Sequence, residues 1–309
     1  MSSPTFLLKK LILVTGKGGV GKTTIASSIA IAAASSGRRT LLTSLHSHKN
    51  AQHPVFDLPL SYDPAQVAED LFASQIDPRL AFKEYALRHL PFKYFARRIV
   101  EHKLLTSFID ALPGLHELMV LGKLYDLLRG TASCPPFDLV VFDGPASGHM
   151  AIMLRVPEVT LKAVRTGPVH DTTQKIHSLL SNKLETEIFV VTLPAELPLN
   201  EANELMQELK EQLFLPVGPL LMNQIVQPRF SAREISALER IGNTDPIWKE
   251  IREAVHIRFS TATDQAAYLA LARSQHPTAS LPFEFSFHDR PRELCQSIAQ
   301  RMVGPSDIL

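Results

Sequence analysis

The chain has 309 residues, which is enough for one large or two modest domains with a complete hydrophobic core. Apolar residues make up 45% of the sequence and aromatic residues only 7%, which indicates an aliphatic core of helices and sheet. The formal net charge of +1 gives no sign of a strongly basic surface, so we expect no nucleic-acid partner.

The cysteines and the apolar segments indicate a cytoplasmic protein. Cys134 and Cys295 lie far apart and show no CxxC spacing, which argues against thiol-bound zinc within one chain and fits a reducing compartment. The N-terminal apolar stretch runs directly into a glycine loop and is typical of a strand rather than a signal peptide. The most apolar helical run, Ile25 to Ala34, is too short to span a bilayer.

The chain opens with the pattern of a strand, a glycine turn, a helix and a second strand. The apolar run Leu11 to Thr15 predicts a buried parallel strand. Thr23 to Ser35 is small, apolar and helix-forming, and Gly37 follows it as a C-cap. Arg39 to Leu45 predicts the second strand, which completes a βαβ unit.

The middle of the chain has weaker strand signals. His46 to Pro64 reads as a loop, and Ala65 to Arg129 reads as mostly helical with breaks at prolines. We therefore expect a helical insertion over about residues 65–130, stacked on one side of the sheet.

The second half alternates strands and helices again. Asp138 to Phe142 is the strongest apolar run and predicts a central strand. A short helical segment should cover about residues 150–183. The later elements that we expect are strands at Glu187–Leu193, Val217–Met222 and Ala279–Phe283, and helices at Asn200–Gln212 and Arg290–Met302.

A phosphate-binding loop lies between the first strand and the first helix. Residues 16–23 read G-K-G-G-V-G-K-T and satisfy the pattern G-x-x-x-x-G-K-[ST] in the strand-to-helix context that it requires. Lys22 should reach the β and γ phosphates of ATP, and the Thr23 hydroxyl should bind Mg²⁺. The residues expected to contact the phosphates are Gly18, Gly19, Val20, Gly21, Lys22, Thr23 and Thr24.

The central strand ends in a carboxylate that complements this loop. In the run F-D-L-V-V-F-D, Asp143 closes an apolar strand, which is the Walker B form and would hold Mg²⁺ together with Thr23. The loop and the alternation of elements together predict an α/β, doubly wound parallel sheet of the P-loop NTPase type, with residues 1–309 as a single domain.

Lys17, the second lysine of the loop, resembles the signature lysine of the deviant Walker A class of P-loop proteins. In that class this lysine acts like an arginine finger that one subunit supplies to the nucleotide of its partner. The resemblance implies that Lys17 is catalytic together with Lys22 and that ATP closes a dimer.

Several further segments resemble the arsenical pump-driving ATPase and guided-entry (tail-anchored protein targeting) ATPase family. They are Pro113–Glu117 (P-G-L-H-E), Asp143–His149 (D-G-P-A-S-G-H), Leu154–Glu158 (L-R-V-P-E), Val191–Glu196 (V-T-L-P-A-E) and Met222–Gln224 (M-N-Q). Their order and spacing cover most of the chain.

The resemblance implies roles for two of these segments. Asp143–His149 matches switch II, which senses the γ-phosphate, although only its aspartate and its final Gly148 and His149 keep the family letters D-T-A-P-T-G-H. Asn223 stands where the family reads adenine, and Pro282 is a second expected adenine contact.

Switch I of the family, S-T-D-P-A-H-S, is altered here. The segment reads S-L-H-S-H-K-N, so His46 replaces the aspartate that positions the attacking water. Either His46 acts as the base, since an imidazole titrates near neutral pH, or ATP is bound and hydrolysed slowly. We favour slow hydrolysis.

The sequence therefore predicts an ATP-binding switch ATPase that couples dimer closure to a protein client or membrane partner. A nucleotide-dependent homodimer is expected, and a heterodimer with a paralogue is the alternative. Two other functions stay open at this point: a P-loop small-molecule kinase or ligase, and a partition or positioning ATPase. The kinase would need a further base or lysine beside the γ-phosphate.

Overall fold

The computed structural model describes residues 5–46, 52–89, 112–131, 134–240, 246–282 and 290–303. These residues form an eight-stranded sheet in the order β3-β4-β2-β5-β1-β6-β7-β8. Neighbouring strands are parallel except for β3 and β4, which are antiparallel. The predicted α/β, doubly wound parallel sheet is confirmed.

The strands are β1 (Leu11–Gly16), β2 (Thr40–Leu45), β3 (Ala65–Ala68), β4 (Leu71–Ile76), β5 (Leu139–Ala146), β6 (Thr186–Thr192), β7 (Leu220–Ile225) and β8 (Thr278–Pro282). The helical elements are η1 (Thr5–Leu8), α1 (Lys22–Ser35), α2 (Pro78–His89), α5 (Leu115–Arg129), α6 (Ser147–Ala163), α7 (Pro168–Ser181), α8 (Glu196–Gln207), η2 (Glu208–Gln212), α9 (Ala232–Glu239), α10 (Pro246–Gln275) and α11 (Pro291–Val303).

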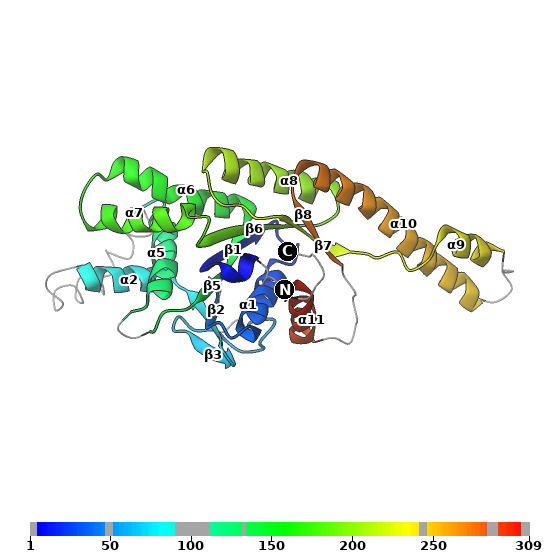
Figure 1. The fold of residues 1–309 in the computed structure, drawn as a ribbon, viewed down its shortest axis with the longest axis horizontal. Coiled ribbons are helices and arrows are strands. Elements are labelled where there is room, and N and C mark those ends of the chain that lie inside the picture. The colour runs from blue at the N-terminus through cyan, green and yellow to red at the C-terminus, as the bar shows by residue number, and fades with distance from the viewer. Residues whose placement is uncertain are drawn as a thin grey trace.

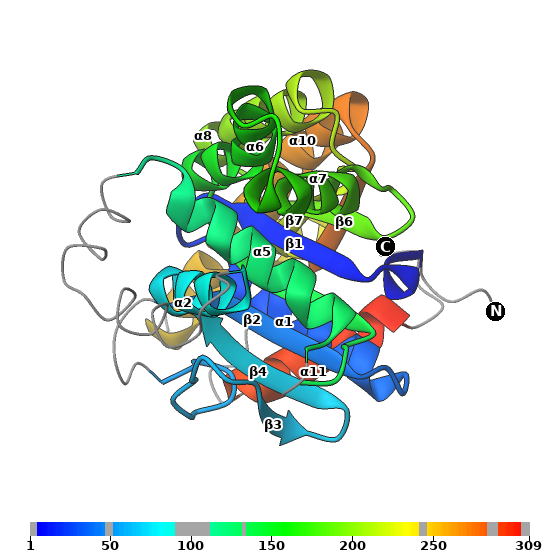
Figure 2. The same cartoon turned by 90° about the vertical axis from the view of Figure 1, so that its left-hand side faces the viewer.

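Helices cover both faces of the sheet, with α1 and α11 on one face and α5, α6, α7 and α8 on the other (Figure 2). Successive side chains of a strand point to opposite faces, so each central strand contributes side chains to the hydrophobic cores on both faces of the sheet. In β1, Leu13 packs into the core under α5 to α8, whereas Ile12 and Val14 pack against α1. Buried on both faces, the central strands are continuous apolar runs, as the sequence pattern requires of parallel strands.

The expected helical insertion over about residues 65–130 begins later than predicted. Ala65–Ala68 and Leu71–Ile76 are not helical but form β3 and β4, which extend the sheet at its edge. In β4 every residue is buried except Phe72, which is half-buried, because this strand is packed on both faces and lacks the alternation that marks a half-exposed strand. Helix is found in this region from Pro78 to His89 and from Leu115 to Arg129.

Helix α6 follows β5 with no intervening residue. β5 ends at Ala146 and α6 begins at Ser147, with Ala146 in an extended conformation as the N-cap. Pro157 lies inside α6. The predicted switch II segment is therefore the junction between a central strand and a helix of the α5 to α8 layer.

Helices α9 and α10 project from one end of the molecule (Figure 1). The 30-residue helix α10 is attached to the sheet through Gln265. The Gln265 side chain accepts a hydrogen bond from the Val226 amide at 2.7 Å and donates one to the Gln224 carbonyl at 3.3 Å. This fixes the chain that leaves β7.

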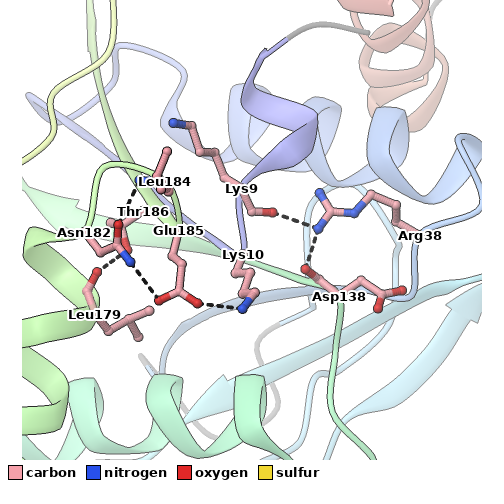
Figure 3. A network of polar contacts seen from close by, with 9 residues as sticks. All are labelled: Lys9, Lys10, Arg38, Asp138, Leu179, Asn182, Leu184, Glu185 and Thr186. Carbon is pink, nitrogen blue, oxygen red and sulfur yellow. Dashed lines mark hydrogen bonds and ion pairs between the residues drawn. The ribbon is translucent and has the colours of Figure 1, made fainter.

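The amino ends of the central strands are held by a polar network (Figure 3). Lys10, which precedes β1, contacts the Glu185 carboxylate at 2.6 Å. Arg38, which precedes β2, donates to the carbonyls of Lys9 at 2.8 Å and Asp138 at 2.5 Å. These contacts hold β1, β2, β5 and β6 together where the strands begin, at the end of the sheet opposite the phosphate loop.

None of the helices in the described part of the chain combines the length and apolar content that a bilayer crossing needs.

Candidate nucleotide site

The phosphate loop is enclosed at its end and open in its middle. Gly21 has a φ of 94°, and a Cβ there would lie 2.3 Å from Nδ2 of Asn223. Only glycine fits this backbone without strain. Gly18 and Gly19 instead have no atom within 4 Å of where a Cβ would stand. The central part of the loop therefore presents accessible backbone, as an anion-binding loop requires.

Helix α1 points its amino end at this loop. It begins at Lys22, and its N-cap, Gly21, provides no side-chain cap. The amide groups of the first turn, which includes Thr23 and Thr24, are then the donors that a phosphate can accept from.

The two loop lysines have different partners. The Lys22 ammonium donates to the Lys17 carbonyl at 2.9 Å. The Lys17 ammonium leaves the loop and pairs with Glu201 Oε1 on α8 at 2.6 Å. The Lys22 side chain thus lies over the phosphate loop, whereas the Lys17 side chain is held by α8 of the same chain.

Thr23, in the first turn of α1, and Asp143, in the carboxyl half of β5, lie side by side. The Thr23 hydroxyl donates to Asp143 Oδ2 at 2.6 Å. The second oxygen, Asp143 Oδ1, is buried and has no hydrogen-bond partner among the described residues. A hydroxyl and an orphaned carboxylate oxygen are hard donors of the kind that Mg²⁺ prefers, so the residues present fit this ion.

Burial governs the electrostatics of this pair. It raises the pKa of Asp143, while the Thr23 hydrogen bond and the Lys22 charge act in the opposite direction. Burial also lowers the pKa of Lys22, and the Asp143 charge opposes that shift. A carboxylate that burial destabilises gains most from a nearby cation, which is the environment expected of a metal ligand.

Asn223, the predicted adenine reader, lies against the loop. Its side chain is buried and donates to the Val20 carbonyl at 2.9 Å. Pro282 ends β8, next to β7, and pairs in register with Ile225. Both residues are on the strands at one side of the loop, and their contact with adenine stays a prediction.

Switch II is linked to the start of α5. His149 Nε2 lies 3.7 Å from Glu117 Oε1, and this carboxylate is mostly buried. Val156, later in α6, packs so closely on Gly114 that a Cβ there would meet its side chain at 3.2 Å. The segments P-G-L-H-E, D-G-P-A-S-G-H and L-R-V-P-E, which are separate in sequence, therefore meet in space.

His46 lies at the carboxyl end of β2 and is exposed. Its backbone amide donates to the Ile76 carbonyl at 3.0 Å, and its ring Nδ1 lies 3.2 Å from Gln75 Oε1. Both contacts are with β4, whereas Asp143 is on β5 at the other side of β2. The imidazole is thus hydrogen-bonded toward the strand that lies away from Asp143.

Sequence reasoning missed three side chains that contact the predicted site residues: Glu201 at Lys17, Gln75 at His46 and Glu117 at His149. Gln75 lies in a strand that was predicted as helix. Glu201 lies within a helix that was predicted, and because parallel strands bring their following loops to one edge, its general place was foreseeable. Which side chain of that helix meets Lys17 depends on how the helix is docked.

The fold and this constellation define a P-loop protein of the ATPase type, and comparison with known families agrees. The chain belongs to the anion-transporting ATPase family, whose family model matches residues 9–167. The match runs from the residue before Lys10 to the end of the α6–α7 connection and includes both Thr23 and Asp143. The resemblance found in the sequence is confirmed.

Curated relatives carry related names. ATPase BagA of Mycobacterium tuberculosis is 29% identical over 235 residues, which is 74% of this chain and 68% of that protein. ATPase ASNA1 homolog 1 of Paramecium tetraurelia is 26% identical over 257 residues, covering 71% of this chain and 76% of its own. An arsenical pump-driving ATPase of Acidiphilium multivorum is 30% identical over 162 residues, 51% of this chain and 27% of its own.

Proposed function

We propose that this chain binds ATP with Mg²⁺ in the loop of residues 16–23 and uses it to switch between two states of a dimer. The observation that carries the proposal is the 2.6 Å contact between Thr23 and Asp143 beneath an open glycine loop. Membership of an ATPase family and the relatives named as ATPases support the nucleotide.

Each residue has a task that follows from its position. The amides of Gly18 to Thr24 hold the phosphates, and Lys22 leaves the Lys17 carbonyl to reach the β and γ phosphates. Thr23 and Asp143 hold the ion, which supplies positive charge to the transferring phosphoryl group when bound. Asn223 and Pro282 form one side of the adenine pocket.

Lys17 is proposed to act across a dimer on the nucleotide of the partner. The part of the loop next to it, Gly18 and Gly19, is exposed, so a second molecule can reach it. A homodimer is the simplest arrangement, and a heterodimer with a paralogue would use the same face.

The switch would be read by a protein client or membrane partner through the α5 to α8 layer. Support comes from the direct junction of β5 with α6 and from the contact between His149 and Glu117. A change in the position of Asp143–His149 on γ-phosphate binding would have to move the start of α6.

ATP hydrolysis is proposed to be slow. His46 stands where the family has its water-positioning aspartate, and its ring contacts Gln75 rather than a group near Asp143. Phosphoryl transfer depends mainly on positioning, so a missing positioner lowers the rate without preventing ATP binding.

The test combines nucleotide binding with particle size. Wild-type protein should bind a non-hydrolysable ATP analogue with Mg²⁺ and change from monomer to dimer in sedimentation. Lys22→Ala should lose both, because the phosphates lose a half-buried cation beside the loop. Lys162→Ala, which alters an exposed lysine of α6, is the matched control and should change neither. A wild-type monomer that stays monomeric with analogue bound would overturn the dimer.

A further inference from the structure

Lys17, the signature lysine of the loop, already forms an ion pair with a carboxylate of its own chain. Lys17 Nζ lies 2.6 Å from Glu201 Oε1, and the two side chains are 36% and 34% exposed. The partners are 184 residues apart in sequence, so the contact exists only in the folded protein.

Glu201 is presented from a rigid base. Helix α8 begins at Glu196, after a three-residue connection from the end of β6 at Thr192, and its buried residues anchor it to the layer over the sheet. The loop side is less constrained, because Gly18 and Gly19 have open space around them. The ion pair therefore fastens the exposed part of the phosphate loop to a fixed helix.

From this geometry we propose that Glu201 is a latch that holds Lys17 within its own subunit and opposes dimer closure. The inference rests on the proposed function, since it requires Lys17 to serve the nucleotide of a partner. The same ammonium cannot lie 2.6 Å from Glu201 and reach across to a partner's phosphates. Each closure must therefore break one latch in each subunit.

Nucleotide binding loosens the latch through Lys22. In this structure the Lys22 ammonium is bonded to the carbonyl of Lys17, so residue 17 is fixed at both its main chain and its side chain. When phosphates draw Lys22 away, the main-chain contact is lost and only Glu201 still restrains the residue. The latch thus links occupancy of the loop to the release of Lys17.

The size of the effect follows from the exposure of the pair. Ion pairs that remain partly solvated shift an equilibrium by about two- to fivefold. A symmetric dimer contains two latches, so the factors multiply. Removing Glu201 should lower the dimer dissociation constant by about tenfold, from about threefold for each subunit.

The experiment measures the dimer dissociation constant by sedimentation, with the non-hydrolysable ATP analogue and Mg²⁺ in excess. Glu201→Gln keeps the shape of the side chain and removes its charge. Glu204→Gln, three residues along the same helix and exposed, removes the same charge without touching Lys17 and is the matched control. Analogue affinity is measured on each variant below the dimerising concentration, and thermal unfolding checks that each is folded.

We expect Glu201→Gln to dimerise about tenfold more tightly than Glu204→Gln, and Glu201→Asp to fall between them. Because nucleotide binding and the latch are coupled, the analogue affinity of the Glu201→Gln monomer should rise, by no more than about threefold. Equal dimerisation of the Gln variants would overturn the latch alone. Weaker dimerisation of Glu201→Gln would also overturn it and place Glu201 in the closed interface. If wild type and Glu201→Gln bind analogue but both remain monomeric, the latch falls together with the proposed dimer.

Discussion

The two faces of the sheet are built differently. On one face, nine of the 14 residues of α1 are buried, and they are almost all small or aliphatic. Helix α11 packs on α1, and Cys295 Sγ reaches the Thr24 carbonyl at 3.6 Å. On the other face, five of the 17 residues of α6 are buried, and its outer surface carries Ile152 at 60% and Val159 at 55% exposure.

Polar contacts sharpen the contrast. The α5 to α8 layer is joined by ion pairs at its surface, such as that of Arg155 with Glu208 at 2.6 Å, and by the His149 contact with Glu117. Contacts of this kind are partly solvated and are each worth little, so they can be exchanged at small cost. The α1 face is held by close packing, in which a change of even one methylene group is felt. If the proposed function holds, the α1 face would fix the nucleotide and the α5 to α8 face would respond to it.

The largest effect is expected at the fixed face, in Gly21→Ala. The new Cβ would lie 2.3 Å from Asn223 Nδ2, and the φ of 94° is strained for alanine. We expect nucleotide affinity to fall by on the order of a thousandfold, measured by titration calorimetry. Gly37→Ala is the control, because it has a similar φ of 78° but open space at its Cβ. Its nucleotide binding should be unchanged.

Asp143→Asn should abolish the contribution of Mg²⁺ to nucleotide binding without destabilising the fold. The dependence of nucleotide affinity on Mg²⁺ should be lost and turnover should fall by about a hundredfold, because the orphaned carboxylate becomes an amide. Because burial raises the pKa of Asp143, the charged form is disfavoured, and the amide should keep or raise the melting temperature of the nucleotide-free protein. Asp138→Asn, just before the same strand, should leave the Mg²⁺ dependence intact. Full Mg²⁺ dependence in Asp143→Asn would contradict the assignment of the metal site.

A pair of isoleucines tests the contrast in packing. Ile29 of α1 is fully buried, and Ile29→Ala should lower the free energy of unfolding by about 2–4 kcal/mol in a urea titration. Ile152→Ala on the outer side of α6 should change it by less than about 0.5 kcal/mol. Similar losses in the two variants would mean that the faces do not differ as described.

The link between switch II and α5 can be cut at Glu117. Glu117→Gln should leave analogue affinity within about twofold, because the carboxylate pairs with His149 rather than with a residue of the loop. The analogue-induced change in amide hydrogen exchange over Leu115–Arg129 should shrink. Glu158→Gln, whose partner is the exposed Lys162 on the same helix, serves as the control. An unaltered exchange response in Glu117→Gln would show that the signal takes another route.

The smallest effect is expected at switch I. If hydrolysis is slow because no acid positions the water, His46→Ala should change the turnover by less than about threefold. A fall of more than tenfold would make His46 the base. Rapid turnover in wild type that survives the substitution would refute both interpretations of this residue.

Much of the fold was readable from the sequence because its strands are continuous apolar runs next to glycines. β1, β5 and the phosphate loop could be located within a few residues. β3 and β4 could not, since Leu71–Ile76 has no alternation and contains Ser74 and Gln75, which are buried and give no sheet signal. β4 takes its strand form by pairing with β2, which is a long-range contact, and β3 pairs in turn with β4.

The site was predictable to the extent that it is local. The loop from Gly16 to Thr23 is one continuous motif, and Asp143 follows from the parallel-sheet rule that strand ends meet. The contact of Glu201 with Lys17 was not predictable, because it depends on the rotation of α8 about its own axis. The same holds for Gln75 beside His46. Packing, rather than any local pattern, sets both.

Pro157 interrupts the backbone hydrogen bonding of α6. A proline has no amide hydrogen, so the carbonyl one turn earlier, at Met153, loses its helical partner. The helix is therefore weakest between Met153 and Pro157. The segment from Ser147 to Met153, ahead of this gap in the hydrogen bonding, is about 10 Å of helix joined directly to the end of β5. The turns beyond it, which carry Val159, form a second segment, and we expect any bend of α6 to fall between the two.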